Sequence, residues 1–209
     1  MNAKTHTTAL DDLSYIRTMA EEGRHAPLIG GRIGLMWGCL LTVTLLLHGL
    51  TELGITGLSS EYIGLFWFIF GITGGILTFI LSKSLKDKPG LSAVTNRVES
   101  AVWTASTLAL FTVAIAVTLA VTLRGQSLIL YDMIMAFAFA TQAMNYYVVS
   151  QVTGQKSRLI PAALSLAFAA LTILFIGQPI IYIVASIGVI FTIILPALMD
   201  MKKEPKNVV

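Results

Sequence analysis

Charged residues are scarce in this chain and are confined to short stretches of it. Asp, Glu, Lys and Arg make up 12% of the 209 residues, whereas they make up about a quarter of an average soluble domain. Six apolar runs lie between the charged stretches, at 33–53, 62–82, 100–123, 128–150, 159–177 and 179–199. A helix needs about 20 residues to cross a bilayer core ~30 Å thick. Each run therefore predicts one membrane-spanning helix, and little chain is left for a soluble domain.

Cysteine and histidine are also rare. Cys39 is the single cysteine, which excludes an intramolecular disulfide and a CxxC redox or zinc motif. His48 is the one histidine inside a predicted span, so a haem held between two facing histidines is not expected. Coupled transporters usually carry an ionised residue deep in the membrane, and none is visible in these runs. We expect no catalytic residues, no metal and no cofactor.

Lys and Arg are unevenly divided between the two ends of the runs. Thirteen of the fourteen lie before the first, third and fifth runs or after the sixth, and Arg124 alone lies in the other connections. Such an excess marks the cytoplasmic side, so both termini are expected in the cytoplasm. No signal segment and no Asn-x-Ser/Thr site is recognisable. We expect a bacterial inner-membrane protein whose positive charge serves orientation and lipid attraction, with no nucleic acid as a partner.

The predicted fold is an all-α transmembrane bundle of six helices, built as three helical hairpins. The chain divides into a cytoplasmic segment, a membrane domain and a basic tail, at 1–31, 32–200 and 201–209. Apolar residues at helical spacing predict an amphipathic helix over about 8–23. Gly177-Gln178-Pro179 is expected to separate the last two spans, and Pro196 to kink or end the final helix.

The fourth run contains neighbouring polar residues near its middle, namely Thr141, Gln142 and Asn145. Amide side chains at that depth must find hydrogen-bond partners, so they should face the bundle. They could line a polar cavity for a substrate or water, or they could hold neighbouring helices together. We favour the second interpretation because no charged residue accompanies them.

Ionisable residues also gather at the predicted outer face, namely His48, Glu52, Glu61 and Asp132. His48 and Glu52 are four residues apart and share one helix face. An imidazole with carboxylates is the donor set of a metal or cation site, although one histidine is a weak signal. The favoured interpretation is an ordinary hydrated helix end.

Glycines recur every four positions at the start of the first run and within the second, at Gly30, Gly34 and Gly38 and at Gly71 and Gly75. Ala101, Ala105 and Ala109 repeat the pattern in the third run. Small residues at this spacing let two membrane helices approach closely. The pattern predicts packing within the bundle or, as an alternative, an interface with another chain.

The specific function cannot be derived from these patterns. The favoured hypothesis is a non-enzymatic accessory, assembly or regulatory membrane subunit, with the bilayer and a membrane-protein partner or a second copy as its partners. The alternative is a small transporter or channel using Gln142 and Asn145. A metal-binding protein or intramembrane enzyme at His48 and Glu52 is the least favoured hypothesis.

Overall fold

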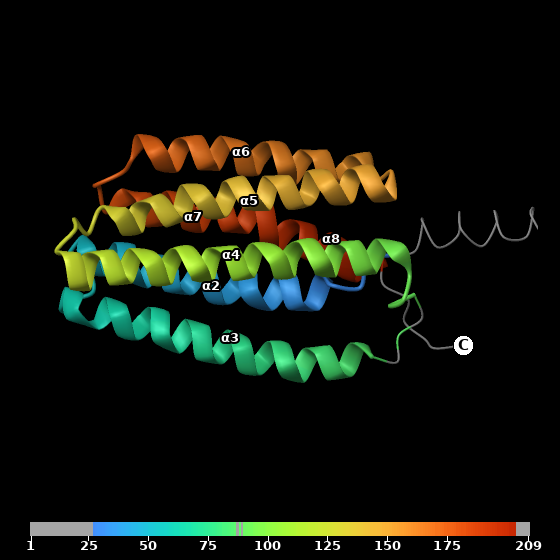
Figure 1. Ribbon diagram of the computed structural model, residues 1–209, viewed down its shortest axis with the longest axis horizontal. Coiled ribbons are helices and arrows are strands. Elements are labelled where there is room, and N and C mark those ends of the chain that lie inside the picture. Colours follow the sequence, from blue (N-terminus) through green and yellow to red (C-terminus); the bar gives the residue numbers. More distant parts are fainter. Residues whose placement is uncertain (1–26, 87, 89, 204–209) are drawn as a thin grey trace, which may run out of the picture.

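The computed structural model describes residues 27–86, 88 and 90–203, and these residues form helices and short connections without any strand. Figure 1 shows the long helices running side by side along one axis of the molecule. The fold is therefore all-α, as the sequence predicts. The predicted amphipathic helix at 8–23 and the end of the basic tail lie outside the described residues.

The helices follow the apolar runs, with ends shifted by a few residues. The long ones are α2 (Gly31–Glu52), α3 (Ile63–Leu85), α4 (Val94–Arg124), α5 (Leu130–Thr153) and α6 (Leu159–Leu174). Short 3₁₀ turns, η1 (Ser60–Tyr62) and η2 (Lys156–Arg158), lead into α3 and α6. The last run forms α7 (Ile180–Val189), the π-helical segment η3 (Ile190–Ile194) and α8 (Leu195–Lys203) without interruption.

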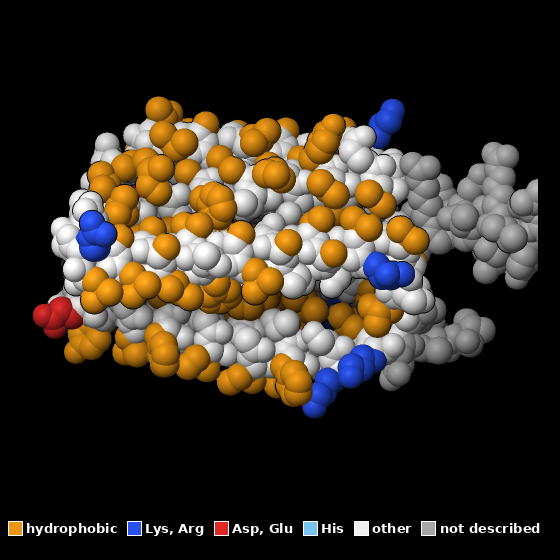
Figure 2. Space-filling view, viewed as in Figure 1, with side chains coloured by type: hydrophobic (Ala, Val, Ile, Leu, Met, Phe, Trp, Pro, Cys, Tyr) orange, Lys and Arg blue, Asp and Glu red, His pale blue; other side chains and the backbone are white. Residues whose placement is uncertain are grey.

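Five helical stretches are long and apolar enough to cross a membrane, which makes the chain compatible with an integral membrane protein. Figure 2 shows the same property on the surface, where charged side chains lie at the ends of the helices and the flank between them is uncharged. The fourth run forms a helix of 24 residues, α5, that is not among the five. Asp132, Gln142 and Asn145 lower its apolar content, and all three are buried against other helices.

The helices pack as a row of neighbours rather than around one central helix. α5 lies between α4 and α6, and α6 in turn contacts α7 and η3. α2 covers the other side of α7, η3 and α8 and also holds α3. α3 has no comparable contact with any other long helix. Leu45 of α2, Phe139 of α5 and Ile181 of α7 are buried where these layers meet.

Pro196 does not end the last helix, because α8 runs on to Lys203. The disturbance lies one turn earlier, where the backbone widens into the π-helical segment η3. Proline has no N–H, and its ring collides with the carbonyl four residues before it. For Pro196 that carbonyl belongs to Thr192, inside η3. The helix therefore does not end at Pro196, and the proline accompanies a local widening of the backbone, while a kink there stays a prediction.

The two glycine repeats have different surroundings. A Cβ at Gly38 would lie 2.8 Å from Ile194 Cγ1, and one at Gly34 would lie 3.4 Å from the Ala197 Cβ. The repeat in α2 therefore packs against the last helix of the same chain. A Cβ at Gly71 or Gly75 would meet nothing within 4 Å, so the repeat in α3 faces away from the rest of the described chain.

Gly74, beside that open repeat, is where α3 attaches to α2. The ring of Trp37 occupies the space that a Cβ on Gly74 would take. The same ring donates from Nε1 to Thr78 Oγ1 at 2.9 Å and meets the Phe70 ring edge to face, with centroids 5.2 Å apart. Trp37 thus packs closely against α3 at a point where α3 has no side chain.

We expect Gly74→Ala to destabilise the folded protein by about 1–3 kcal/mol, because the added methyl group would overlap the Trp37 ring and displace it from its packed position. Gly75→Ala is the matched control, since its methyl enters open space and alanine improves helix propensity by up to about 1 kcal/mol. Thermal or denaturant unfolding of the purified proteins in mild detergent compares the two. An equal loss in both variants would show that the Trp37 contact does not hold α3.

Candidate functional site

Polar side chains of α5 converge on one backbone carbonyl of the last helix. Gln142 Nε2 donates to the Thr192 oxygen at 2.9 Å, and the Tyr146 hydroxyl donates to the same oxygen at 2.6 Å. Thr192 lies in η3, four residues before Pro196, which has no N–H to offer that carbonyl. The α5 side chains therefore donate to a carbonyl for which the usual α-helical donor, the N–H four residues on, is missing. We call Gln142, Tyr146 and Thr192 the Thr192 junction.

The remaining polar residues of the predicted cavity are arranged differently. Asn145 Oδ1 accepts a hydrogen bond from the Ser106 hydroxyl of α4 at 2.8 Å. Its Nδ2 is buried and has no hydrogen-bond partner among the described residues. Thr141 is half-buried and donates to carbonyls of its own helix, at Phe137 and Ala138. Gln142 and Asn145 thus bond to neighbouring helices, whereas Thr141 does not.

At the opposite end of α5 from η2, aromatic side chains connect His48 to Asp132. Trp67 Nε1 donates to His48 Nδ1 at 3.1 Å. The His48 ring stacks on Tyr182, with centroids 3.5 Å apart and planes inclined by 25°. The Tyr182 hydroxyl donates to Asp132 Oδ1 at 2.7 Å. This chain of contacts, the His48–Asp132 network, joins α2, α3, α5 and α7.

Asp132 is 7% exposed, so its carboxylate needs hydrogen-bond donors from the protein. Besides Tyr182, the backbone N–H of Gly177 donates to its Oδ2 at 2.8 Å. Gly177 has a φ of +80°, which a residue with a side chain rarely adopts. The sequence predicts the turn between α6 and α7 from Gly177-Gln178-Pro179. In the structure this turn also supplies a hydrogen-bond donor, the Gly177 N–H, to the buried Asp132 carboxylate.

The predicted outer-face cation site is brought together only in part. His48 and Asp132 share the network through Tyr182, while Glu52 and Glu61 are exposed and take no part in these hydrogen bonds. No group of three or more His, Cys, Asp and Glu residues able to hold a metal occurs in the described part of the chain. Cation binding here stays a prediction.

A buried ion pair at the other end of the bundle is absent from the sequence-based candidates. Arg158, at the start of α6, pairs with Asp200 of α8, and both residues are nearly buried. They are 42 positions apart in the sequence. Each lies beside a predicted span end, where charged residues are common, so composition offered no signal that the two would meet.

Asn96 is a second feature of this end that the sequence did not reveal. Its Oδ1 accepts from the Ile29 N–H at 3.0 Å, and its Nδ2 donates to the carbonyls of Pro27 and Gly90 at 3.0 and 2.9 Å. One side chain of α4 thus fixes the segment before α2 and the loop before α4. Pro27 and Leu28 are held in place beside the ion pair.

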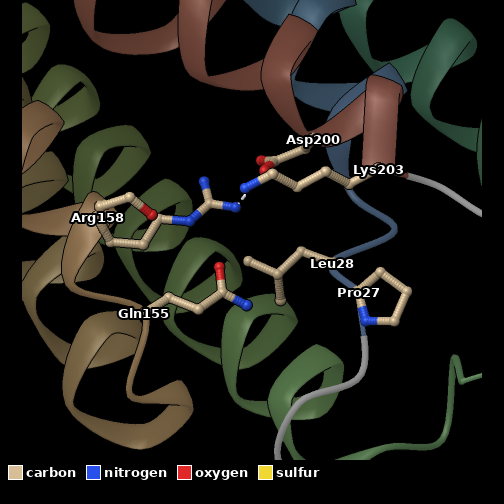
Figure 3. Close-up of a pocket in the computed structure, with 7 residues that line it drawn as sticks. Pro27, Leu28, Gln155, Arg158, Asp200 and Lys203 are labelled. Carbon is tan, nitrogen blue, oxygen red and sulfur yellow. Dashed lines mark hydrogen bonds and ion pairs between the residues drawn. The ribbon is translucent and has the colours of Figure 1, made fainter.

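A pocket of about 220 Å³ opens at this end, between the segment before α2, the η2 turn and α8. It is lined by Pro27, Leu28, Gln155, Ser157, Arg158, Asp200 and Lys203. Figure 3 shows Gln155, Arg158 and Lys203 converging on the same space, with Asp200 bonded to Arg158. We call it the basic-end pocket, because the described Lys and Arg residues other than Arg124 lie in the segments at this end of the helices.

A second hollow is an apolar groove of about 480 Å³ between α5 and α6. It is lined by Ala143, Met144, Tyr147, Val148, Leu159, Ala162, Ala163 and Leu166. Leu159 directly follows Arg158, so the groove and the basic-end pocket both reach the start of α6.

No protein-family model matches the chain, and neither a curated protein nor a solved structure is significantly similar to it.

Replacement of Gln142 tests whether the Thr192 junction holds the bundle together. We expect Gln142→Leu to lower the unfolding free energy by about 1 kcal/mol, the usual scale of a hydrogen bond between membrane helices. The loss stays moderate because Tyr146 still donates to the Thr192 carbonyl. Thr141→Val is the control, since that hydroxyl bonds only within α5. Unfolding in detergent measures both; an equal effect would contradict a role for the junction in packing.

Proposed function

We propose that the chain is a six-span protein of a bacterial inner membrane, with both termini in the cytoplasm, that acts as a non-enzymatic accessory, assembly or regulatory subunit. The division of Lys and Arg between the helix ends supports this orientation. Six crossings give three helical hairpins and put both termini on one side of the bilayer, and the basic residues indicate that this side is the cytoplasmic one.

The proposal requires α5 to be the sixth span although it is more polar than the others. Two observations support that assignment. α5 lies side by side with α4 and α6, both of which are long and apolar enough to span. Its polar residues Asp132, Gln142 and Asn145 bond to other helices instead of facing outward. A span of this kind keeps its polar groups away from lipid, as the bilayer requires.

The observation that carries the subunit hypothesis is the isolation of α3. Among the described long helices α3 packs extensively on α2 only, and a Cβ at Gly71 or Gly75 would meet no described residue within 4 Å. A lipid-facing helix gains nothing from glycines, which weaken it by about 1 kcal/mol each relative to alanine. Glycines are favourable, however, where the backbone of another helix packs closely against them. The occupant we propose is a transmembrane helix of another protein.

The polar groups inside the bundle support the same proposal indirectly. An enzyme or transporter needs polar groups that are free to meet a substrate, whereas the Thr192 junction and the His48–Asp132 network join helices to one another. Such contacts stabilise one arrangement of the bundle. A rigid scaffold with an exposed helix suits a subunit that positions or stabilises a neighbour.

Photo-crosslinking in living cells tests the subunit hypothesis. A photoactivatable amino acid in place of Gly71 or Gly75 should give one product of defined mass, the same at both positions and containing a second protein. Ile76, 56% exposed on a neighbouring face of α3, is the control position and should not give it. Gly71→Leu should abolish the product formed from position 75, because a bulky side chain blocks close approach.

Other outcomes of this experiment would contradict the hypothesis. A product that contains only a second copy of the chain would show that the glycine face serves self-association. Equal crosslinking at Ile76 and at the glycines would show random encounters in the membrane. No product at any position would leave α3 without a partner.

One observation favours the transporter as a second candidate function. The buried Nδ2 of Asn145 has no partner among the described residues, so a water or substrate could accept its hydrogen bond. If an aqueous path reaches this residue, Asn145→Cys in a Cys39→Ser background should react with a small water-soluble thiol reagent. Val148→Cys, on the lipid-facing groove, is a control for access through the membrane. Protection of position 145 would contradict a water-filled path.

A further inference from the structure

We propose that the basic-end pocket binds the phosphate of an anionic phospholipid, with Lys203, Gln155 and Ser157 around the head group and Arg158 fixed beside them by Asp200. The proposal depends on the membrane location of the helices. It does not depend on the subunit hypothesis or on the α3 face.

The lining of the pocket combines hydrogen-bond donors with positive charge. Arg158 is 6% exposed and is already paired with Asp200. It therefore forms part of the pocket wall and contributes positive charge, but it does not offer an unpaired guanidinium to a ligand. Glu99 of α4 also influences Arg158 electrostatically, although it is not part of the lining. Lys203, which is exposed, is the cation best placed to meet a ligand. The Gln155 amide and the Ser157 hydroxyl add neutral donors at the rim.

The charge balance selects the kind of anion. Arg158 and Lys203 contribute two positive charges and Asp200 one negative charge, so the lining itself carries one net positive charge. Glu99, which lies near Arg158 but outside the lining, lowers that charge when it is ionised. A phosphodiester carries a single negative charge and matches this balance. A doubly charged phosphate monoester would leave one charge uncompensated beside Asp200. Basic pockets between helices at the cytoplasmic side of a membrane are known binding places for such head groups.

The position of the pocket favours a lipid over a soluble phosphate. It lies at the ends of apolar helices, where lipid head groups meet the protein. Its volume of about 220 Å³ holds roughly seven water molecules at ~30 Å³ each, enough for a phosphate with a small polar group. The apolar groove between α5 and α6 reaches the same helix start and offers a surface for an acyl chain. Pro27 and Leu28 supply an apolar wall.

The test is lipid binding by the full chain, measured by native mass spectrometry after extraction in mild detergent. Phosphatidylglycerol, phosphatidylcholine and inorganic phosphate are the probes. We expect retention of phosphatidylglycerol and little of the other two. Lys203→Gln should weaken that binding about fivefold, the usual effect of one basic residue near an anionic membrane surface. Gln155→Glu should weaken it further by placing a negative charge in the pocket.

Lys202→Gln is the matched control. Lys202 is exposed, precedes Lys203 in α8 and does not line the pocket. Unchanged binding in this variant, together with the loss in Lys203→Gln, supports the pocket. Equal losses in both variants would reduce the effect to general surface charge and overturn the proposal. Binding of inorganic phosphate without a response to phosphatidylglycerol would assign the pocket to a soluble ligand and overturn the lipid assignment.

Discussion

The carbonyl of Thr192 imposes the constraint on which the packing of the bundle depends. Pro196 cannot donate a hydrogen bond to it, and the backbone around it widens into a π-helical segment. In an apolar surrounding an unsatisfied carbonyl is costly, because no water can replace the missing donor. Gln142 and Tyr146 supply that donor from α5. The polar face of α5 lies against the last helix at this carbonyl, and two of its side chains donate to it.

The polar residues of α5 are explained by this contact and by hydrogen bonds that other α5 side chains make elsewhere along the helix. Near its start Asp132 takes hydrogen bonds from Tyr182 and Gly177, and in its second half Asn145 binds Ser106 of α4. Along its length α5 is thus tied to α4, to the α6–α7 turn, to α7 and to η3. α3 has fewer contacts of this kind: the Trp37 ring lies over Gly74, and Trp67 donates a hydrogen bond to His48. Among the described helices α5, α6, α7 and α2 form the connected part of the bundle, and α3 and α4 lie at its edges, each packed extensively on one long helix.

Much of the fold follows from the sequence because it depends on local patterns. The apolar runs predict the helices, Gly177 and Pro179 mark the turn before α7, and amide side chains in the fourth run predict contacts inside the bundle. Hydrogen bonds from side chains to backbone atoms could not be predicted, because every residue has a backbone carbonyl and nothing in the sequence marks that of Thr192 as an acceptor. A helix end at Pro196 was wrong for a similar reason: proline affects a partner four residues away, and the helix widens there instead of ending.

The candidate sites were harder to predict than the helices, because they join residues far apart in the chain. His48 and Glu52 share a helix face, yet His48 stacks on Tyr182 while Glu52 stays exposed. Arg158 and Asp200 pair across 42 positions, and each alone resembles an ordinary charged helix end. Segregation of Lys and Arg indicates which end of the bundle is basic but not which cation remains available. That distinction comes from Asp200, which forms an ion pair with Arg158, while Lys203, exposed and also in the field of Asp200, lines the pocket.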